Sequence, residues 1–235
     1  AEKRAIVHKE PHKHGWRHQG RYLVAAATVN PNVELRAVCE LVLKASRCCA
    51  SAKEVDDVLD DAFLELNPLI TTTLRPEAHE LIHALGETNE FLNCIVTNSH
   101  PNRVIRVVSH LHEGFGKKVI GSASKGYIDP WFRKIPDHSF HMPGFGRRMP
   151  LRRRKYFVIL DALRKRYGLE WSDMCVVGDV LETDLLIALY MGAYACLIDH
   201  DRVPAYERAF MASHPRARIV SGPREAILFF KENLL

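Results

Sequence analysis

The chain has 235 residues, of which 47% are hydrophobic and 26% charged, and its formal net charge is +5. This length and composition are ordinary for a soluble globular protein that buries a sizeable core. No apolar run reaches the ~18 residues of a membrane span, and residues 1–20 lack the apolar core of a signal peptide, so neither is predicted.

Residues 1–20 are polar, basic and rich in histidine, and they predict an extended tail. Without a surrounding fold, the histidines favour a flexible tail over a metal site. A second basic block runs from Arg147 to Lys155. Both basic segments are candidates to contact RNA or an acidic protein face, and the alternative is that both are simply solvated.

The first elements of the folded core follow the tail. A short apolar run from Tyr22 to Ala27 predicts a buried strand. Helical periodicity then extends over 33–47 and 52–66, and this pair predicts a small helical cap inserted after the first strand. A third helix is predicted over 76–86, where a proline begins the pattern and a glycine ends it.

From residue 91 onward, strand and helix patterns alternate. The predicted strands cover 91–97, 117–121, 174–178, 194–198 and 219–220. The predicted helices cover 101–112, 151–167, 183–191, 204–213 and 223–233. Apolar strands that alternate with helices indicate a parallel sheet covered on both faces, in a Rossmann-like α/β fold. The stretch 122–150 is too long for a simple connection and predicts an ordered excursion over the open end of the sheet or onto a partner.

Polar residues follow the predicted strand at 91–97. Thr97, Asn98 and Ser99 lie just before a helix N-terminus, where hydroxyl and N–H groups can hold a phosphate. The same residue types are also ordinary helix caps, so this segment alone is compatible with both roles.

A second polar turn follows the predicted strand at 174–178. Gly178 and Asp179 end the strand, and Asp184 follows five residues later. Two carboxylates beside a tight turn suit Mg²⁺, and the alternative is that Asp179 caps the next helix. Lys155, at the start of the helix predicted over 151–167, is placed either to reach a phosphoryl oxygen or to be solvated.

The order of these segments resembles motifs two, three and four of the haloacid dehalogenase (HAD) superfamily of phosphohydrolases. The resemblance implies a HAD-like core over 21–32 and 67–235, with the helical cap at 33–66. It also implies roles for six residues: Thr97 on the phosphoryl oxygens, Lys155 neutralising charge, Asn98 and Ser99 binding substrate, and Asp179 and Asp184 on Mg²⁺.

The chain departs from this family at the first motif. The resemblance implies Asp-x-Asp at the end of the first strand, where one aspartate attacks phosphorus and the other is the general acid/base. Ala25 and Ala27 occupy these two positions, and Thr28-Val29 follow as in the family. Alanine can neither form an aspartyl-phosphate nor transfer a proton, so the chain is expected to be close to inactive, with Mg²⁺ bound weakly or not at all.

Three functions stay open after this comparison, the third of them a module that binds a phosphorylated ligand through Thr97, Lys155 and neighbouring arginines without turnover. The first is a Mg²⁺-dependent phosphatase of a phosphorylated small molecule, with its catalytic aspartates replaced. The alternative is a natural pseudoenzyme, a structural or assembly subunit of a larger organellar or RNA-containing complex that it contacts through the basic tail and Arg147–Lys155. The six cysteines form no CxxC pair, which favours a reducing location such as the cytoplasm or the mitochondrial matrix.

Overall fold

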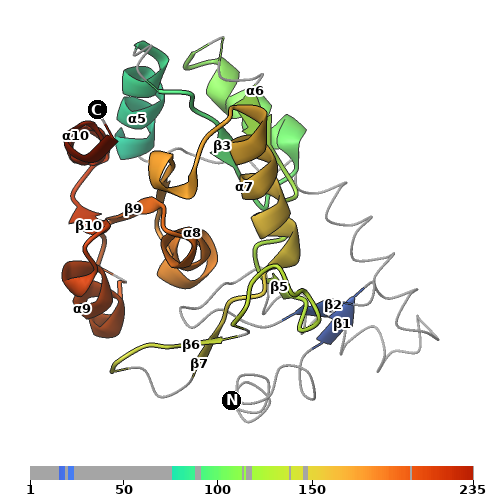
Figure 1. Ribbon diagram of the computed structural model, residues 1–235. Coiled ribbons are helices and arrows are strands. Elements are labelled where there is room, and N and C mark those ends of the chain that lie inside the picture. Colours follow the sequence, from blue (N-terminus) through green and yellow to red (C-terminus); the bar gives the residue numbers. More distant parts are fainter. Residues whose placement is uncertain are drawn as a thin grey trace.

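The computed structural model describes residues 16–18, 21–23, 76–87, 91–112, 114, 118–137, 139–144, 148–201 and 203–234 (Figure 1). The helical cap predicted at 33–66 lies outside the described residues, as do Ala25 and Ala27. The described part is a mixed α/β structure with parallel and antiparallel strands.

A three-stranded parallel sheet forms the C-terminal half. Its strands are β8 (Cys175–Gly178), β9 (Tyr194–Ile198) and β10 (Ala217–Val220), hydrogen-bonded in the order β10-β9-β8. The π-helical turn η3 (Leu181–Leu185) and α8 (Leu186–Met191) connect β8 to β9, and α9 (Ala205–Ser213) connects β9 to β10. Helix α10 (Pro223–Leu234) closes the chain. The strand and helix alternation predicted for this half is confirmed.

Both faces of this sheet are covered. Along β9, Ala195 and Leu197 pack into the larger core, which also holds α8 and part of α7 (Arg154–Arg166). Cys196 points to the opposite face and packs against Val220 and the buried side chains of α10. Successive residues of a strand face opposite sides, so unbroken apolar character in β9 follows from helices on both faces.

A second parallel pair lies apart from this sheet. It consists of β3 (Ile95–Val96) and β4 (Val119–Ile120), which α6 (Pro101–Ser109) connects. Helix α5 (Pro76–Glu87) packs its Ile82 beside Val108 of α6, and α5 also lies against α10 (Figure 1). Among the described residues no strand joins β3–β4 to β8–β10, so the single parallel sheet expected from the sequence is present in two parts.

The first predicted strand pairs differently from the expectation. β2 (Arg21–Leu23) is antiparallel to β1 (Trp16–His18) and to β5 (Tyr127–Ile128), so the prediction that the run from Tyr22 to Ala27 is a strand of the parallel sheet is wrong for its described part. Residues 16–18, predicted as tail, are β1. Two residues separate β1 from β2, and such a short connection permits only an antiparallel pair, because parallel neighbours need a crossover of about a dozen residues.

The long stretch 122–150 is ordered where it is described. It contributes β5, β6 (Ser139–His141) and β7 (Arg148–Pro150), of which the last two form an antiparallel pair. Three of its side chains, Ile135, Met142 and Met149, are fully buried in the larger core. The prediction that this stretch is ordered is therefore confirmed for its described part, and its buried residues extend the core itself.

The basic block predicted as a contact surface is interrupted by two buried arginines, whereas Arg148 and Arg154 are exposed. Arg152 and Arg153 are only 4% and 1% exposed. The Arg152 guanidinium donates to the carbonyl oxygens of Ile135, Pro130 and Pro136 and so fixes the excursion. The prediction of a continuous basic surface from Arg147 to Lys155 is therefore wrong at two positions: backbone carbonyls surround the Arg152 guanidinium, and Arg153 contacts the Lys125 carbonyl and the Glu182 carboxylate.

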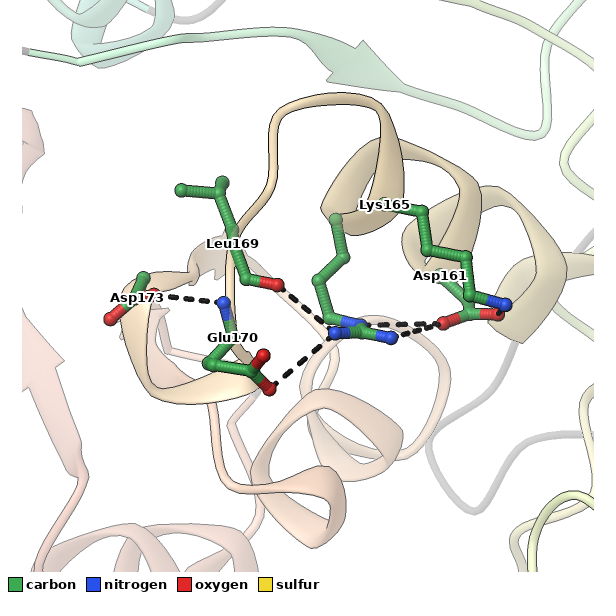
Figure 2. A network of polar contacts seen from close by, with 6 residues as sticks. Asp161, Lys165, Leu169, Glu170 and Asp173 are labelled. Atoms are coloured by element: carbon green, nitrogen blue, oxygen red, sulfur yellow. Dashed lines mark hydrogen bonds and ion pairs between the residues drawn. The ribbon is translucent and has the colours of Figure 1, made fainter.

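The end of α7 is tied to the short η2 turn (Trp171–Asp173) by polar contacts (Figure 2). Arg164 donates to the Asp161 carboxylate at 3.1 Å and to the Leu169 carbonyl at 3.0 Å, and the Asp173 carboxylate accepts from the Glu170 N–H. Cations in the last turn also offset the helix dipole. In the described part, no helix is long and apolar enough to cross a membrane.

Candidate functional site

The polar residues predicted from the sequence gather where β3, β4 and β8 end. The loop after β3 and the loop after β4 are bonded to each other: the Ala123 N–H donates to the Thr97 carbonyl at 2.9 Å, and the Ser122 N–H donates to the Ser99 carbonyl at 2.9 Å. Parallel strands deliver their carboxyl ends to one edge, which is where open α/β sheets place ligands. The two loops therefore form one surface.

The loop after β4 has an unusual backbone. Ser122 and Ser124 have φ angles of 51° and 50°. These angles lie in the left-handed region, which residues other than Gly and Asn rarely adopt. Before them, Gly121 passes so close to Pro101 that an added Cβ would lie 2.5 Å from its ring. A backbone held in sparsely populated conformations at the end of strands is typical of functional loops.

Thr97 and Asn98 support this surface with their side chains. Thr97 Oγ1 accepts from the Ser99 N–H at 3.1 Å, and Asn98 Oδ1 accepts from the Lys125 N–H at 2.8 Å. Because Thr97 Oγ1 acts as an acceptor in its bond with Ser99, its hydroxyl proton can still be donated to a ligand. Asn98, predicted to bind substrate, holds the loop that carries Lys125 through its side-chain oxygen.

Lys155 occupies the predicted place in the first turn of α7. Its Nζ lies 3.4 Å from Ser124 Oγ, so the lysine reaches the loop after β4. The structure thus brings Thr97, Asn98, Ser99 and Lys155 to one edge of the fold.

The second polar turn contributes Asp184 more directly than Asp179. Gly178 allows η3 to approach, since an added Cβ would lie 2.6 Å from the Asp184 Cβ. Asp184 Oδ2 then accepts the Val180 N–H at 3.2 Å. Asp179 is exposed, and its carbonyl is 3.1 Å from His200 Nε2.

Lys125 is the residue of this site that sequence reasoning missed. Its Nζ lies 2.9 Å from Asp184 Oδ1, and both side chains are only 12% exposed. The same ammonium is 5.0 Å from the Tyr156 ring centre, and the Tyr156 hydroxyl donates to the Asp184 carbonyl at 2.8 Å. A signal for Lys125 was present in the glycine and serine run just before it, Gly121-Ser122-Ala123-Ser124, which follows a predicted strand.

Buried charges lie behind this edge. Arg153 Nη2 is 2.9 Å from Glu182 Oε1, with both side chains almost fully buried. Glu207 is fully buried beside them, and burial raises the pKa of its carboxyl to about 7, with the negative charges of Glu182, Asp184 and Asp179 adding to the effect. Desolvation disfavours the charged carboxylate, which is why the proton is retained to higher pH.

Asp179 and Asp184 are the two carboxylates that the sequence resemblance assigns to Mg²⁺. A cation would compete with Lys125 for Asp184 Oδ1, because that oxygen already carries an ion pair. Within the described residues, no group of three or more His, Cys, Asp or Glu side chains is arranged to hold a metal.

Models of protein families and curated proteins were both compared with the chain, and none matches.

Proposed function

We propose that the chain is a HAD-like phosphohydrolase scaffold whose strand-end loops hold a phosphoryl group of a phosphorylated small molecule. The observation that carries this proposal is the meeting of the loops after β3, β4 and β8, linked by the Lys125–Asp184 ion pair and by the Lys155–Ser124 contact. Hydroxyl and N–H donors with ammonium groups are the usual partners of a phosphate.

The chemistry available at this edge is binding and charge neutralisation. Lys155 and the Thr97 hydroxyl supply donors for phosphoryl oxygens. In an active form of the chain, Asp179 and Asp184 would bind Mg²⁺. The attacking carboxylate is the missing part, since Ala25 and Ala27 stand at its expected positions. That assignment rests on the sequence resemblance alone, because β2 pairs with β1 and β5 rather than with β3. We therefore expect phosphate binding without appreciable turnover.

The test measures binding of inorganic phosphate to the whole chain by calorimetry, with Mg²⁺ and with EDTA. Lys155→Met should weaken binding by roughly 10-fold or more, because a charge-assisted hydrogen bond contributes about 1.5–3 kcal/mol. The matched control is Lys165→Met, in the last turn of the same helix, which should bind phosphate like the parent chain. Hydrolysis of an aryl phosphate should stay near the uncatalysed rate.

Equal phosphate affinity in the parent chain and in Lys155→Met would contradict the proposal. Absence of saturable binding in the parent chain would contradict it as well.

One observation favours the second function, a pseudoenzyme that serves as a subunit of a larger assembly. Trp131, in the excursion, is 56% exposed, and nearby Arg154 lies over the Phe132 ring at 5.9 Å while pairing with Asp129 at 3.3 Å. Tryptophan and arginine together are enriched where proteins bind one another. A protein partner would then contact Trp131 and Arg154 rather than a continuous basic block.

A further inference from the structure

Helix α5 carries the sequence His79-Glu80-Leu81-Ile82-His83. Two histidines four residues apart lie roughly 40° from each other around an α-helix and one turn apart along it. Their imidazole rings are therefore on the same face. The same H-E-x-x-H spacing on a helix is known as an arrangement in which two histidines bind zinc.

The orientation of α5 is fixed by packing on a face that is adjacent to the two histidines rather than opposite them. Ile82 is 6% exposed and packs with Val108, and the helix also lies against α10 (Figure 1). His79 and His83 are both exposed. Packing on one side of the helix thus directs the pair of imidazoles to solvent.

The two histidines share one hollow of the surface. This depression has a volume of about 460 Å³ and is lined by His79, Glu80, His83, Ala84, Leu111 and Arg224. Neither Thr97 nor Lys155 lines this depression, so a metal bound there would be independent of the proposed phosphate site. Two imidazoles that open into one hollow can reach the same ion.

We propose that His79 and His83 bind a divalent transition-metal ion, of the class of Zn²⁺, as a two-imidazole site on α5. Imidazole nitrogen is a preferred ligand of zinc, copper and nickel and a poor one for Mg²⁺. Within the described residues, no third His, Cys, Asp or Glu is grouped with them, so the proposed site has two protein ligands and water would complete the coordination. Catalytic zinc sites use three protein ligands. With two ligands, His79 and His83 are expected to bind the metal without catalysis.

The experiment titrates Zn²⁺ into the whole chain and follows amide hydrogen exchange of residues 76–87. A metal that bridges one turn of α5 should slow exchange within that helix, because opening the turn breaks the chelate. Histidines at residues 1–20 can also take up zinc, and exchange within α5 distinguishes the two locations. His79→Ala should remove the slowing and weaken the α5 site at least about tenfold, a loss that even an outer partner of a metal ligand can cause.

Two control variants test whether the effect depends on the spacing of the two histidines in α5. His83→Ala combined with Ala84→His preserves the number of histidines but changes their spacing from four to five, which should abolish the effect on α5. His110→Ala removes a single exposed histidine next to α6 and should leave the effect intact. Circular dichroism of each variant checks the total helix content, and exchange of residues 76–87 without zinc checks that α5 still forms. Unchanged exchange of α5 on zinc addition, or an equal effect in His79→Ala, would overturn the proposal.

Discussion

At the scale of single residues, the unusual group is Glu207. It lies in the first turn of α9, fully buried, and its Oε2 accepts the Leu181 N–H at 3.3 Å. Burial raises the pKa of this carboxyl from its ordinary value of 4.5 to about 7. The backbone hydrogen bond from Leu181 acts in the opposite direction and favours the charged form, but desolvation is the larger effect.

This pKa predicts how the free energy of unfolding depends on pH. Below about pH 4.5 both folded and unfolded chains carry the proton, so the contribution of Glu207 is fully present there. As pH rises towards 7 the unfolded chain ionises first, and the folded state loses about 3 kcal/mol from this group. Glu207→Gln should remove that dependence and should be more stable than the parent chain at pH 8.

The measurement is urea denaturation of both proteins at several values between pH 5 and pH 8. The difference between them isolates Glu207 from the other carboxyl groups. Glu232→Gln, an exposed carboxyl that pairs with Arg218, is the control and should keep the pH dependence of the parent chain. Parallel curves for the parent chain and Glu207→Gln would mean that Glu207 titrates normally.

At the scale of elements, the Arg153–Glu182 pair joins three segments. Arg153 stands just before α7, Glu182 lies in η3, and Arg153 Nη1 also donates to the carbonyl oxygen of Lys125 at 2.6 Å. The pair therefore holds the loop after β4, the start of α7 and the turn after β8 in one arrangement. These are the elements that place Lys125, Lys155 and Asp184.

Removing one member of this pair should be costly. Arg153→Met leaves the Glu182 carboxylate buried without its cation, and such a loss destabilises proteins by about 3–5 kcal/mol. A second change, Glu182→Leu, should restore much of the stability, because the pair's attraction mostly offsets its desolvation. Urea denaturation of the two single variants and the double variant gives the coupling energy. Lys165→Met, which breaks the more exposed contact with Asp161, should change stability by less than about 1 kcal/mol.

Additive losses in the double variant would show that Arg153 and Glu182 act independently. That result would assign the stabilisation to the carbonyl contacts of Arg153 instead.

Helices were predictable from the sequence, whereas strand partners were not. The helix predicted over 76–86 is found at Pro76–Glu87, and the one predicted over 223–233 is found at Pro223–Leu234. Proline and glycine mark such boundaries locally. An apolar run, by contrast, indicates burial without naming a neighbour, and so the strand predicted from Tyr22 was assigned to the wrong sheet.

The candidate site was predictable to a similar extent. Thr97, Lys155 and Asp184 were predicted as site residues because each lies near the end of a strand or the start of a helix, which are local patterns, and the structure places them at one edge of the fold. Lys125 meets Asp184 across 59 positions of sequence, and the buried state of Arg153 depends on Glu182, 29 positions away. Spacing within a motif carries no information on such pairs, because they form only when separate elements pack.

At the scale of the whole molecule, the two parallel parts differ in the number of strand partners and in the burial of their side chains. β9 is the central strand of its sheet, with neighbours on both sides, and Ala195, Cys196 and Leu197 are fully buried. β3 has one described partner, and its two residues are partly exposed. Stability within one protein varies in this way, and segments with more buried apolar contacts open less often.

Native-state hydrogen exchange should therefore give different opening free energies for the two parallel parts. The amides of residues 195–197 should exchange only through global unfolding, because opening β9 breaks two ladders and exposes the cores on both of its faces. The amides of β3 and of β6 should exchange at least about tenfold faster, since each lies in a two-stranded pair that can open locally. The measurement follows exchange at low denaturant and compares each opening free energy with that of global unfolding. Equal protection of β3 and β9 would mean that both parallel parts open as one cooperative unit, and the predicted ranking would be wrong.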